Sequence, residues 1–248
     1  MRNKFLAVAA LLGAMLPAAS YADDRGGDGP SADCRSVPSA SALRSALITA
    51  GTKQNGGLFN GSRMWAAVVN RAGELCAIVS STNDPTQVWP GSQAIAKSKA
   101  YTANAFSLDT LALSTARLYT FTQPGHSLWS LGQSNLFDTD FLNSPGKAAQ
   151  GRGQIPGGLI FFGGGVPLYV SGKIVGGLGV SGDTSCADHE VAKSARNTLG
   201  LNPPGGKLAD DITYSAVDGA TPFTHPACLN TWRNGVDLGL TEKPASGY

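Results

Sequence analysis

The sequence predicts an α+β fold, in which helices pack against an antiparallel sheet. Two pairs of β-rich runs, each joined by a short glycine-containing turn, predict two hairpins. Segments with helical periodicity precede the first hairpin, separate the two hairpins and follow the second. A fifth strand is expected at Leu159 to Phe162, directly before the second hairpin.

The first helix is predicted over residues 39–54, and the first hairpin over residues 64–70 and 74–82. Ser39 or Ser41 can cap the helix N-terminus. Four apolar residues of this helix have the i, i+3, i+4, i+7 spacing of a buried stripe, namely Leu43, Ala46, Leu47 and Ala50.

The second helix is predicted over residues 92–106, where several alanines would allow close packing against the sheet. Lys97 is expected at a solvated edge of this helix, because lysine is mostly exposed in proteins. A third helix is expected over residues 109–121. Residues 122–156 then form a long irregular segment with interspersed aromatic residues, which predicts a lid, a binding loop or an oligomer contact.

The second hairpin begins with the loop Gly163-Gly164-Gly165 and continues as predicted strands over residues 166–170 and 173–180. Gly176, Gly177 and Gly179 leave the second strand without side chains, which costs stability unless another group approaches the backbone closely. The hairpin is therefore expected to border either a pocket or a tightly packed helix. A helix over residues 187–199 follows, with cap residues before it and Gly200 after it.

The N-terminus has the composition of a signal peptide. Arg2 and Lys4 precede an apolar run over residues 5–16, and cleavage is predicted after Ala22. The apolar run is too short to span a membrane. We therefore expect an exported protein, periplasmic or secreted, whose residues 23–38 form a flexible leader.

Charge and motifs exclude several function classes. Loss of Arg2 and Lys4 lowers the Lys and Arg count from 19 to 17, which equals the 17 Asp and Glu residues. A neutral chain without a basic cluster argues against nucleic-acid binding. The sequence contains no G-x-S-x-G, H-E-x-x-H or dinucleotide-binding motif, so no catalytic residue is assigned and an enzymatic activity is not indicated.

Four cysteines in an exported chain predict two disulfides. The preferred pairing is Cys34–Cys76 with Cys186–Cys228, which would tie each irregular extension to the core. The alternative joins Cys34 to Cys228 and Cys76 to Cys186. The second extension, residues 202–248, is rich in proline and glycine, with one expected strand over residues 212–217 and an unstructured end after residue 241.

The Cys186–Cys228 pairing would bring two histidines together. His189 lies three residues after Cys186, on the same helix face, and His225 lies three residues before Cys228. With Asp183 and Asp188 nearby, the two imidazoles could hold a transition metal or ligate haem iron. The alternative is that both histidines are half-buried structural groups.

Two stretches resemble the GlcG/HbpS family, also called the haem-degrading-domain family. They are GGGVPLYVSGKIVGGLGVSG, starting at Gly163, and WPGSQAIAKSKAYTANAF, starting at Trp89. The resemblance spans residues 39–201, and it implies a profilin-like fold with a five-stranded antiparallel sheet. It also implies a homo-oligomer.

The resemblance implies an exported protein that binds haem or another tetrapyrrole. Lys99 matches the family's K-A position and faces either a pocket or solvent. With Lys99, the residues Gly163, Gly164, Gly165 and Asp183 are the candidate ligand-binding set. No C-x-x-C-H motif is present, so binding would be non-covalent. The alternative hypothesis is an enzyme or accessory protein acting on a small organic acid or carbonyl compound in a pocket bordered by the glycine-rich strand, Lys99 and Asp183.

Overall fold

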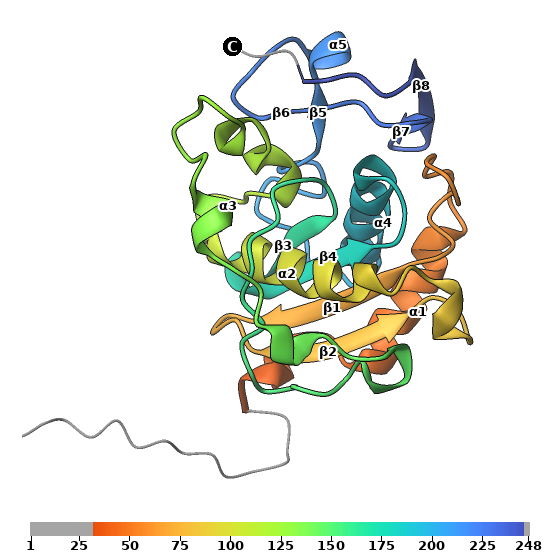
Figure 1. The fold of residues 1–248 in the computed structure, drawn as a ribbon, viewed down its shortest axis with the longest axis vertical. Coiled ribbons are helices and arrows are strands. Elements are labelled where there is room, and N and C mark those ends of the chain that lie inside the picture. Colours follow the sequence, from red (N-terminus) through yellow and green to blue (C-terminus); the bar gives the residue numbers. More distant parts are fainter. Residues whose placement is uncertain (1–31, 246–248) are drawn as a thin grey trace, which may run out of the picture.

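The computed structural model describes residues 32–245, so the predicted signal peptide and most of the predicted leader lie outside the described residues. The core is a four-stranded antiparallel sheet in the order β2-β1-β4-β3 (Figure 1). Its strands are β1 (Trp65–Asn70), β2 (Leu75–Ser80), β3 (Gly165–Val170) and β4 (Lys173–Ser181). The α+β class and both hairpins are confirmed.

The fifth strand predicted at residues 159–162 is wrong. None of these residues is part of a strand, and their backbone groups bond to side chains. The Ile160 N–H donates to the Thr102 hydroxyl at 3.0 Å, and the Thr115 hydroxyl donates to the Phe162 carbonyl at 2.6 Å. The sheet therefore has four strands, and the profilin-like assignment stays a prediction.

Helices cover both faces of the sheet. Helix α2 (Gly91–Ala105) packs on one face, and α1 (Ala40–Gly51) and α4 (Ser185–Thr198) pack on the other. Strand β1 alternates between the two layers: Trp65, Ala67 and Val69 belong to the α2 side, whereas Ala66 and Val68 belong to the α1 and α4 side. All six β1 residues are consequently buried.

Local sequence signals place these helices well. The predicted stripe of four apolar residues in α1 is fully buried, and the Ser39 hydroxyl accepts the Ala42 N–H as N-cap. In α4 the capping residue is Thr184, whose hydroxyl accepts the Ala187 N–H, so the helix begins two residues earlier than predicted.

The bare backbone of β4 accommodates helix α2. A Cβ atom at Gly177 would overlap the Ala100 carbonyl oxygen, and one at Gly179 would overlap the Ala96 carbonyl oxygen. Of the two alternatives for this strand, the tightly packed helix is the one observed. The glycines let α2 lie closer to the sheet than any side chain would permit.

The third helix predicted over residues 109–121 is wrong, because only two short 3₁₀ turns form there, η3 (Thr115–Leu118) and η4 (Thr120–Thr122). Three hydroxyls of this segment bond to distant backbone carbonyls: Ser114 to Asp210, Thr115 to Phe162 and Thr120 to Thr224. These contacts hold the segment in an irregular path.

The long segment over residues 122–156 covers the sheet's own core. Phe141 is buried on the α2 side of the sheet, with Phe137 packed beside it. Leu75 of β2 exchanges backbone hydrogen bonds with Gly153 and Gln154. The segment contains α3 (Leu131–Ser134), η5 (Thr139–Phe141) and η6 (Pro145–Lys147).

Residues 202–211 of the C-terminal extension contact the C-terminal part of α4. Most of the remaining extension lies beyond the end of α4 that carries its N-cap, at the top of Figure 1. The strand expected over residues 212–217 is only two residues long and continues as a helical turn. The elements are β5 (Thr213–Tyr214), α5 (Ser215–Asp218), β6 (Thr224–His225), β7 (Thr231–Arg233) and β8 (Val236–Leu240). Two further 3₁₀ turns are η1 (Ala32–Ser36) and η2 (Pro85–Gln87).

Both extensions are tied to the core by disulfides. Cys34 bonds to Cys76 of β2, and Cys186 of α4 bonds to Cys228, which is the pairing preferred from the sequence. Over the range 32–245, none of the helices is both long enough and apolar enough to cross a membrane.

Candidate functional site

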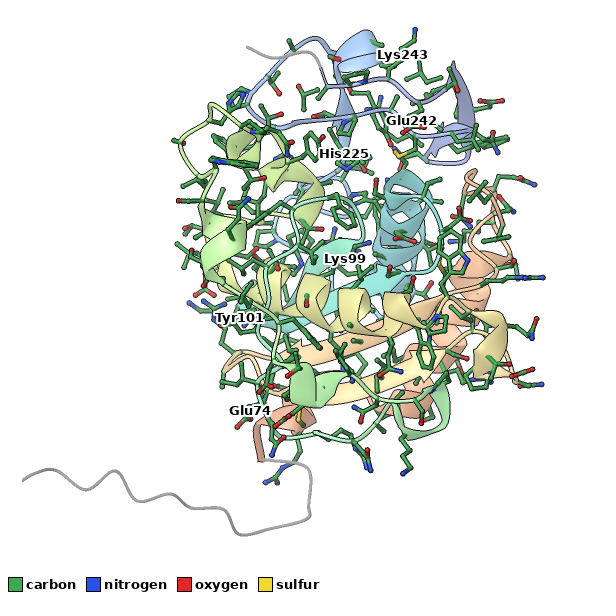
Figure 2. The ribbon with its side chains drawn as sticks, in the orientation of Figure 1. Glu74, Lys99, Tyr101, His225, Glu242 and Lys243 are labelled. Atoms are coloured by element: carbon green, nitrogen blue, oxygen red, sulfur yellow. A yellow bond between two sulfur atoms is a disulfide. The ribbon has the colours of Figure 1, made fainter. Side chains whose placement is uncertain are left out.

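The residues predicted as a ligand site form a buried polar network around the loop Gly163 to Gly165. Lys99 is fully buried, and its Nζ donates to Asp188 Oδ2 at 2.7 Å and to the Val180 carbonyl at 3.1 Å. The ammonium also lies 4.8 Å from the centre of the Phe162 ring. Lys99 therefore faces neither of the two expected environments, an open pocket or solvent; Figure 2 labels it near the centre of the fold.

Burial determines the titration of this ion pair. Desolvation raises the pKa of Asp188 to about 6, and the nearby Lys99 ammonium opposes that rise. Desolvation likewise lowers the pKa of Lys99, against the attraction of the carboxylate. Asp188 Oδ1 also accepts the N–H groups of Gly182 and Asp183, so each oxygen of this carboxylate has hydrogen-bond donors.

The three glycines pack against neighbouring side chains and backbone. A Cβ atom at Gly163 would overlap the Ser185 carbonyl, and one at Gly164, whose φ is +119°, would lie 2.7 Å from Lys99 Nζ. The Gly165 N–H donates to the Thr115 hydroxyl at 2.8 Å. Close packing therefore accounts for the absence of side chains in this loop.

Asp183 organises a neighbouring turn. Its carboxylate accepts the backbone N–H groups of Leu58 at 2.7 Å, Phe59 at 2.8 Å and Gly61 at 3.3 Å. It also accepts the Thr184 N–H at the start of α4. With four backbone donors, this carboxylate fixes the turn after α1 against the α4 N-terminus.

His225 uses both ring nitrogens within the fold. Its Nδ1–H donates to the Pro226 carbonyl at 2.7 Å, and Nε2 accepts the Gly163 N–H at 3.1 Å. Desolvation lowers the pKa of this fully buried imidazole to about 3, so it is neutral at ordinary pH. No lone pair of the ring is free for a metal ion.

His189 packs against the same loop, because a Cβ atom at Gly163 would lie 3.0 Å from the His189 Cβ. Its Nε2 lies 3.6 Å from Asp211 Oδ1, whereas its Nδ1 is buried without a hydrogen-bond partner among the described residues. The structure thus brings both histidines to Gly163. The sequence offered a second interpretation, in which both histidines are structural groups. The two hydrogen bonds of His225 agree with that interpretation.

One group of three residues has the spacing of a metal site but lacks free ligand atoms. Ligand atoms of Cys186, His225 and Cys228 lie within 4.8 Å of one another. The two sulfurs are joined in a disulfide and are not thiolates, which are the forms that bind metals. These residues do not fit a metal centre in this state.

The predicted solvated position of Lys97 is wrong. Its side chain is fully buried, and Nζ donates to the Phe141 carbonyl at 3.0 Å and to Gln93 Oε1 at 3.2 Å. No carboxylate pairs with it among residues 32–245. Desolvation lowers the pKa of Lys97 to about 8. The long segment over residues 122–156 causes this burial by placing Phe141 over the helix.

An open cavity of about 590 Å³ lies next to the buried network. We call it the Tyr119 cavity; its walls come from the η3–η4 region, the N-terminus of α4 and the C-terminal extension. Its apolar lining residues are Leu58, Pro226, Ala227, Leu229 and Pro244, and its polar ones include Tyr119, Thr184, Ser185, Glu242 and Lys243.

Tyr119 connects this cavity to the buried network. Its ring centre lies 5.2 Å from that of His225, and its hydroxyl has no hydrogen-bond partner within the described part of the chain. In Figure 2, Glu242 and Lys243 lie in the C-terminal extension, with His225 between them and Lys99. Sequence reasoning missed Tyr119 and Lys243. The Cys186–Cys228 pairing joins the extension of Lys243 to α4, but no sequence signal linked the segment of Tyr119 to either.

Comparisons with solved structures show low similarity. Protein ORFY of Klebsiella pneumoniae is 23% identical, with a TM-score of 0.47, and the match covers 65% of this chain and 87% of that chain. A PduOC haem complex is 22% identical, with a TM-score of 0.45, over 65% and 92% of the two chains. HbpS is 22% identical, with a TM-score of 0.39, over 65% and 89%.

No curated protein sequence matches the chain. A family model described as haem degrading protein HbpS-like matches residues 39–197, which include α1, the whole sheet, α2 and nearly all of α4. This match covers more than half of the sequence. The chain therefore belongs to the HbpS-like haem degrading protein family.

Proposed function

We propose that the protein is an exported haem- or tetrapyrrole-binding protein that holds its ligand non-covalently. The observation that carries this proposal is membership of the HbpS-like family over residues 39–197. The sequence lacks a C-x-x-C-H attachment motif, which favours non-covalent binding.

The Tyr119 cavity fits such a ligand in its chemistry. A tetrapyrrole has large apolar faces and anionic carboxylates, so it needs apolar walls with a cation at the rim. Leu58 and Leu229 are half exposed at this cavity. Lys243 makes no salt bridge to a carboxylate within residues 32–245, although the neighbouring Glu242 also lines the cavity.

Tyr119 is the residue we assign to the iron. A tyrosine phenolate is one of the side chains that hold haem iron in proteins, and this hydroxyl has no competing partner among the described residues. Leu58 and Leu229 would contact the macrocycle, and Lys243 would pair with a propionate. Bound haem would supply an iron centre at this position, while His225 stays neutral behind the Tyr119 ring.

The decisive experiment is haemin titration followed by the Soret band. We expect saturable binding by the mature protein, a shifted Soret maximum for Tyr119→Phe and affinity about tenfold weaker. Tyr101→Phe is the matched control, because Tyr101 is a partly buried tyrosine of α2 that does not line the cavity. Figure 2 shows it far from Lys243.

Each outcome of this titration has a separate meaning. A spectrum identical to that of free haemin would eliminate haem binding altogether. If Tyr119→Phe and Tyr101→Phe both bind haemin like the unsubstituted protein, the protein binds haem but Tyr119 is not the ligand.

Export is supported by the two disulfides, since such bonds persist in oxidising compartments. We expect protein recovered from the periplasm or medium to begin at Asp23. Peptide mapping without reduction should show Cys34 joined to Cys76 and Cys186 joined to Cys228. Protein retained in the cytoplasm with its first 22 residues intact would contradict export.

A homo-oligomer is the second part of the proposal. Large apolar side chains of the long segment over residues 122–156 are exposed, which is typical of a contact surface: Trp129, Leu136, Leu142 and Ile155. Light scattering coupled to size exclusion should give a mass above 25.4 kDa, the mass of one full chain. A monomer at micromolar concentration would contradict the homo-oligomer proposal and leave the haem-binding proposal unaffected.

The alternative, an enzyme or accessory protein for a small organic acid, depended on Lys99 and Asp183 bordering a pocket. Lys99 is fully buried in an ion pair, and Asp183 is occupied by backbone donors. No observation at those residues favours that alternative.

A further inference from the structure

A second cavity lies where α1, α4 and the C-terminal extension meet, and we call it the lysine cleft. Its volume is about 460 Å³. Glu190, Lys193, Ser194 and Asn197 line it from one face of α4. Residues 52–55, after α1, form the second wall, and Lys207, Asn234 and Gly235 of the extension form the third.

The cleft has an excess of positive charge. Lys53, Lys193 and Lys207 line it, against the single carboxylate of Glu190. That carboxylate is already satisfied, since it accepts Lys193 Nζ at 2.7 Å and the Asn234 N–H at 2.8 Å. Lys193 Nζ is also bonded to Asp211 Oδ1 at 2.6 Å.

The other two lysines have no carboxylate partner within residues 32–245. Lys53 Nζ donates to the Ser194 hydroxyl at 2.7 Å, which is a neutral group. Lys207 is exposed, and its ammonium makes no hydrogen bond to a described residue. Two unneutralised ammonium groups at one concave surface favour an anionic ligand.

The nearby helix C-termini do not cancel this charge. A helix C-terminus carries partial negative charge on its free carbonyls. Here the Ala50 carbonyl of α1 accepts the Lys53 N–H and Asn55 Nδ2, and the Ala195 carbonyl of α4 accepts the Leu199 N–H. These capped carbonyls present little negative charge to the cleft.

Side-chain amides supply the remaining recognition. Asn55 Oδ1 and Asn197 Nδ2 have no partner among the described residues, although their other amide atoms are bonded. Gln54 and Asn234 also line the cleft. Amides both donate and accept, and a polyhydroxylated ligand matches such groups.

From this combination we propose that the lysine cleft binds a sugar acid, a hydroxylated carboxylate whose anionic group pairs with Lys53 and Lys207. The family match ends at residue 197, so Lys207 and Asn234 belong to the extension and not to the matched region. The extension builds a binding site that the family region alone lacks. This proposal is independent of haem binding.

The test is isothermal titration of the full mature protein with glucuronate at low ionic strength. Glucose, which lacks the carboxylate, and citrate, which lacks the sugar hydroxyls, are the comparison ligands. We expect saturable glucuronate binding that is at least tenfold tighter than binding of either comparison ligand. Lys207→Gln should weaken glucuronate binding about tenfold.

Lys147→Gln is the matched control, since Lys147 is an exposed lysine in the long segment over residues 122–156 and does not line the cleft. It should leave glucuronate affinity unchanged. The proposal is overturned if glucuronate gives no saturable binding, or if glucose or citrate binds equally well. Equal weakening by Lys207→Gln and Lys147→Gln would also overturn it, because it would indicate non-specific attraction.

Discussion

Lys97 and Lys99 lie two residues apart on α2, and both are fully buried. They differ in their hydrogen-bond acceptors, because only Lys99 contacts a carboxylate. Lys99 meets the Asp188 carboxylate at 2.7 Å, under the glycine loop and beside α4. Lys97 meets only neutral oxygens, from Phe141 and Gln93, under the long segment over residues 122–156.

The difference shows that burial alone does not define the role of a lysine. A buried cation beside a carboxylate is a structural element whose removal leaves an unpaired charge. A buried cation with only neutral partners bears its desolvation cost without that compensation. Helix α2 therefore contains one lysine that the fold needs and one that reduces its stability.

Loss of the paired lysine should give the largest effect. Lys99→Met leaves the Asp188 carboxylate buried with two backbone donors but no cation. We expect the free energy of unfolding, measured by urea denaturation, to fall by about 3–5 kcal/mol.

Lys99→Met combined with Asp188→Leu tests the cause. Since the double variant removes both charges, it should recover part of the stability that Lys99→Met loses. A loss below about 1 kcal/mol for Lys99→Met would show that the ion pair is not a stabilising feature, in contradiction to the comparison.

The unpaired lysine should respond in the opposite direction. Lys97→Met removes a desolvated ammonium. The Phe141 carbonyl keeps a donor in Asn143 Nδ2 at 3.2 Å, whereas Gln93 Oε1 loses Lys97 as its donor. We expect the free energy of unfolding at pH 7 to rise by about 1 kcal/mol, because the relieved desolvation of the ammonium exceeds the cost of the unpaired amide oxygen. Lys147→Met, at an exposed lysine, should change it by less than about 0.5 kcal/mol. If Lys97→Met instead lowers the free energy of unfolding, Lys97 stabilises the fold as Lys99 does, and the proposed difference between the two lysines is wrong.

The smallest effect is a difference in pH dependence. Burial lowers the pKa of Lys97 from 10.5 to about 8 in the folded chain. Between these pH values the unfolded chain binds a proton that the folded chain lacks at this group, so stability rises with pH. The unsubstituted protein should therefore gain up to about 1 kcal/mol per pH unit relative to Lys97→Met.

This dependence is measured by urea unfolding of both proteins at several pH values. Because Lys99 is present in both proteins, its own lowered pKa cancels in the comparison. The stability advantage of Lys97→Met at pH 7 should shrink towards pH 10. Parallel pH profiles would show that Lys97 titrates at its ordinary pKa.

Elements with strong local signals could be predicted from the sequence. Three local patterns each predicted the observed element: the apolar stripe of α1, the turn glycines of both hairpins and the small residues of α2. The cysteine pairing preferred from sequence also agrees with the structure. For the helix and the turns, neighbouring residues contain the information, whereas each disulfide joins cysteines 42 residues apart in the sequence.

The tertiary structure alone decided where long-range partners meet. Residues 109–121 have helical spacing, but hydroxyl bonds to distant carbonyls hold them as 3₁₀ turns. Lys97 is buried because Phe141, far along the chain, covers it. Tyr119 lines a cavity only because the extension, which Cys228 ties to α4, supplies another of its walls. Such contacts depend on the packing of segments remote in sequence, which residue spacing does not encode.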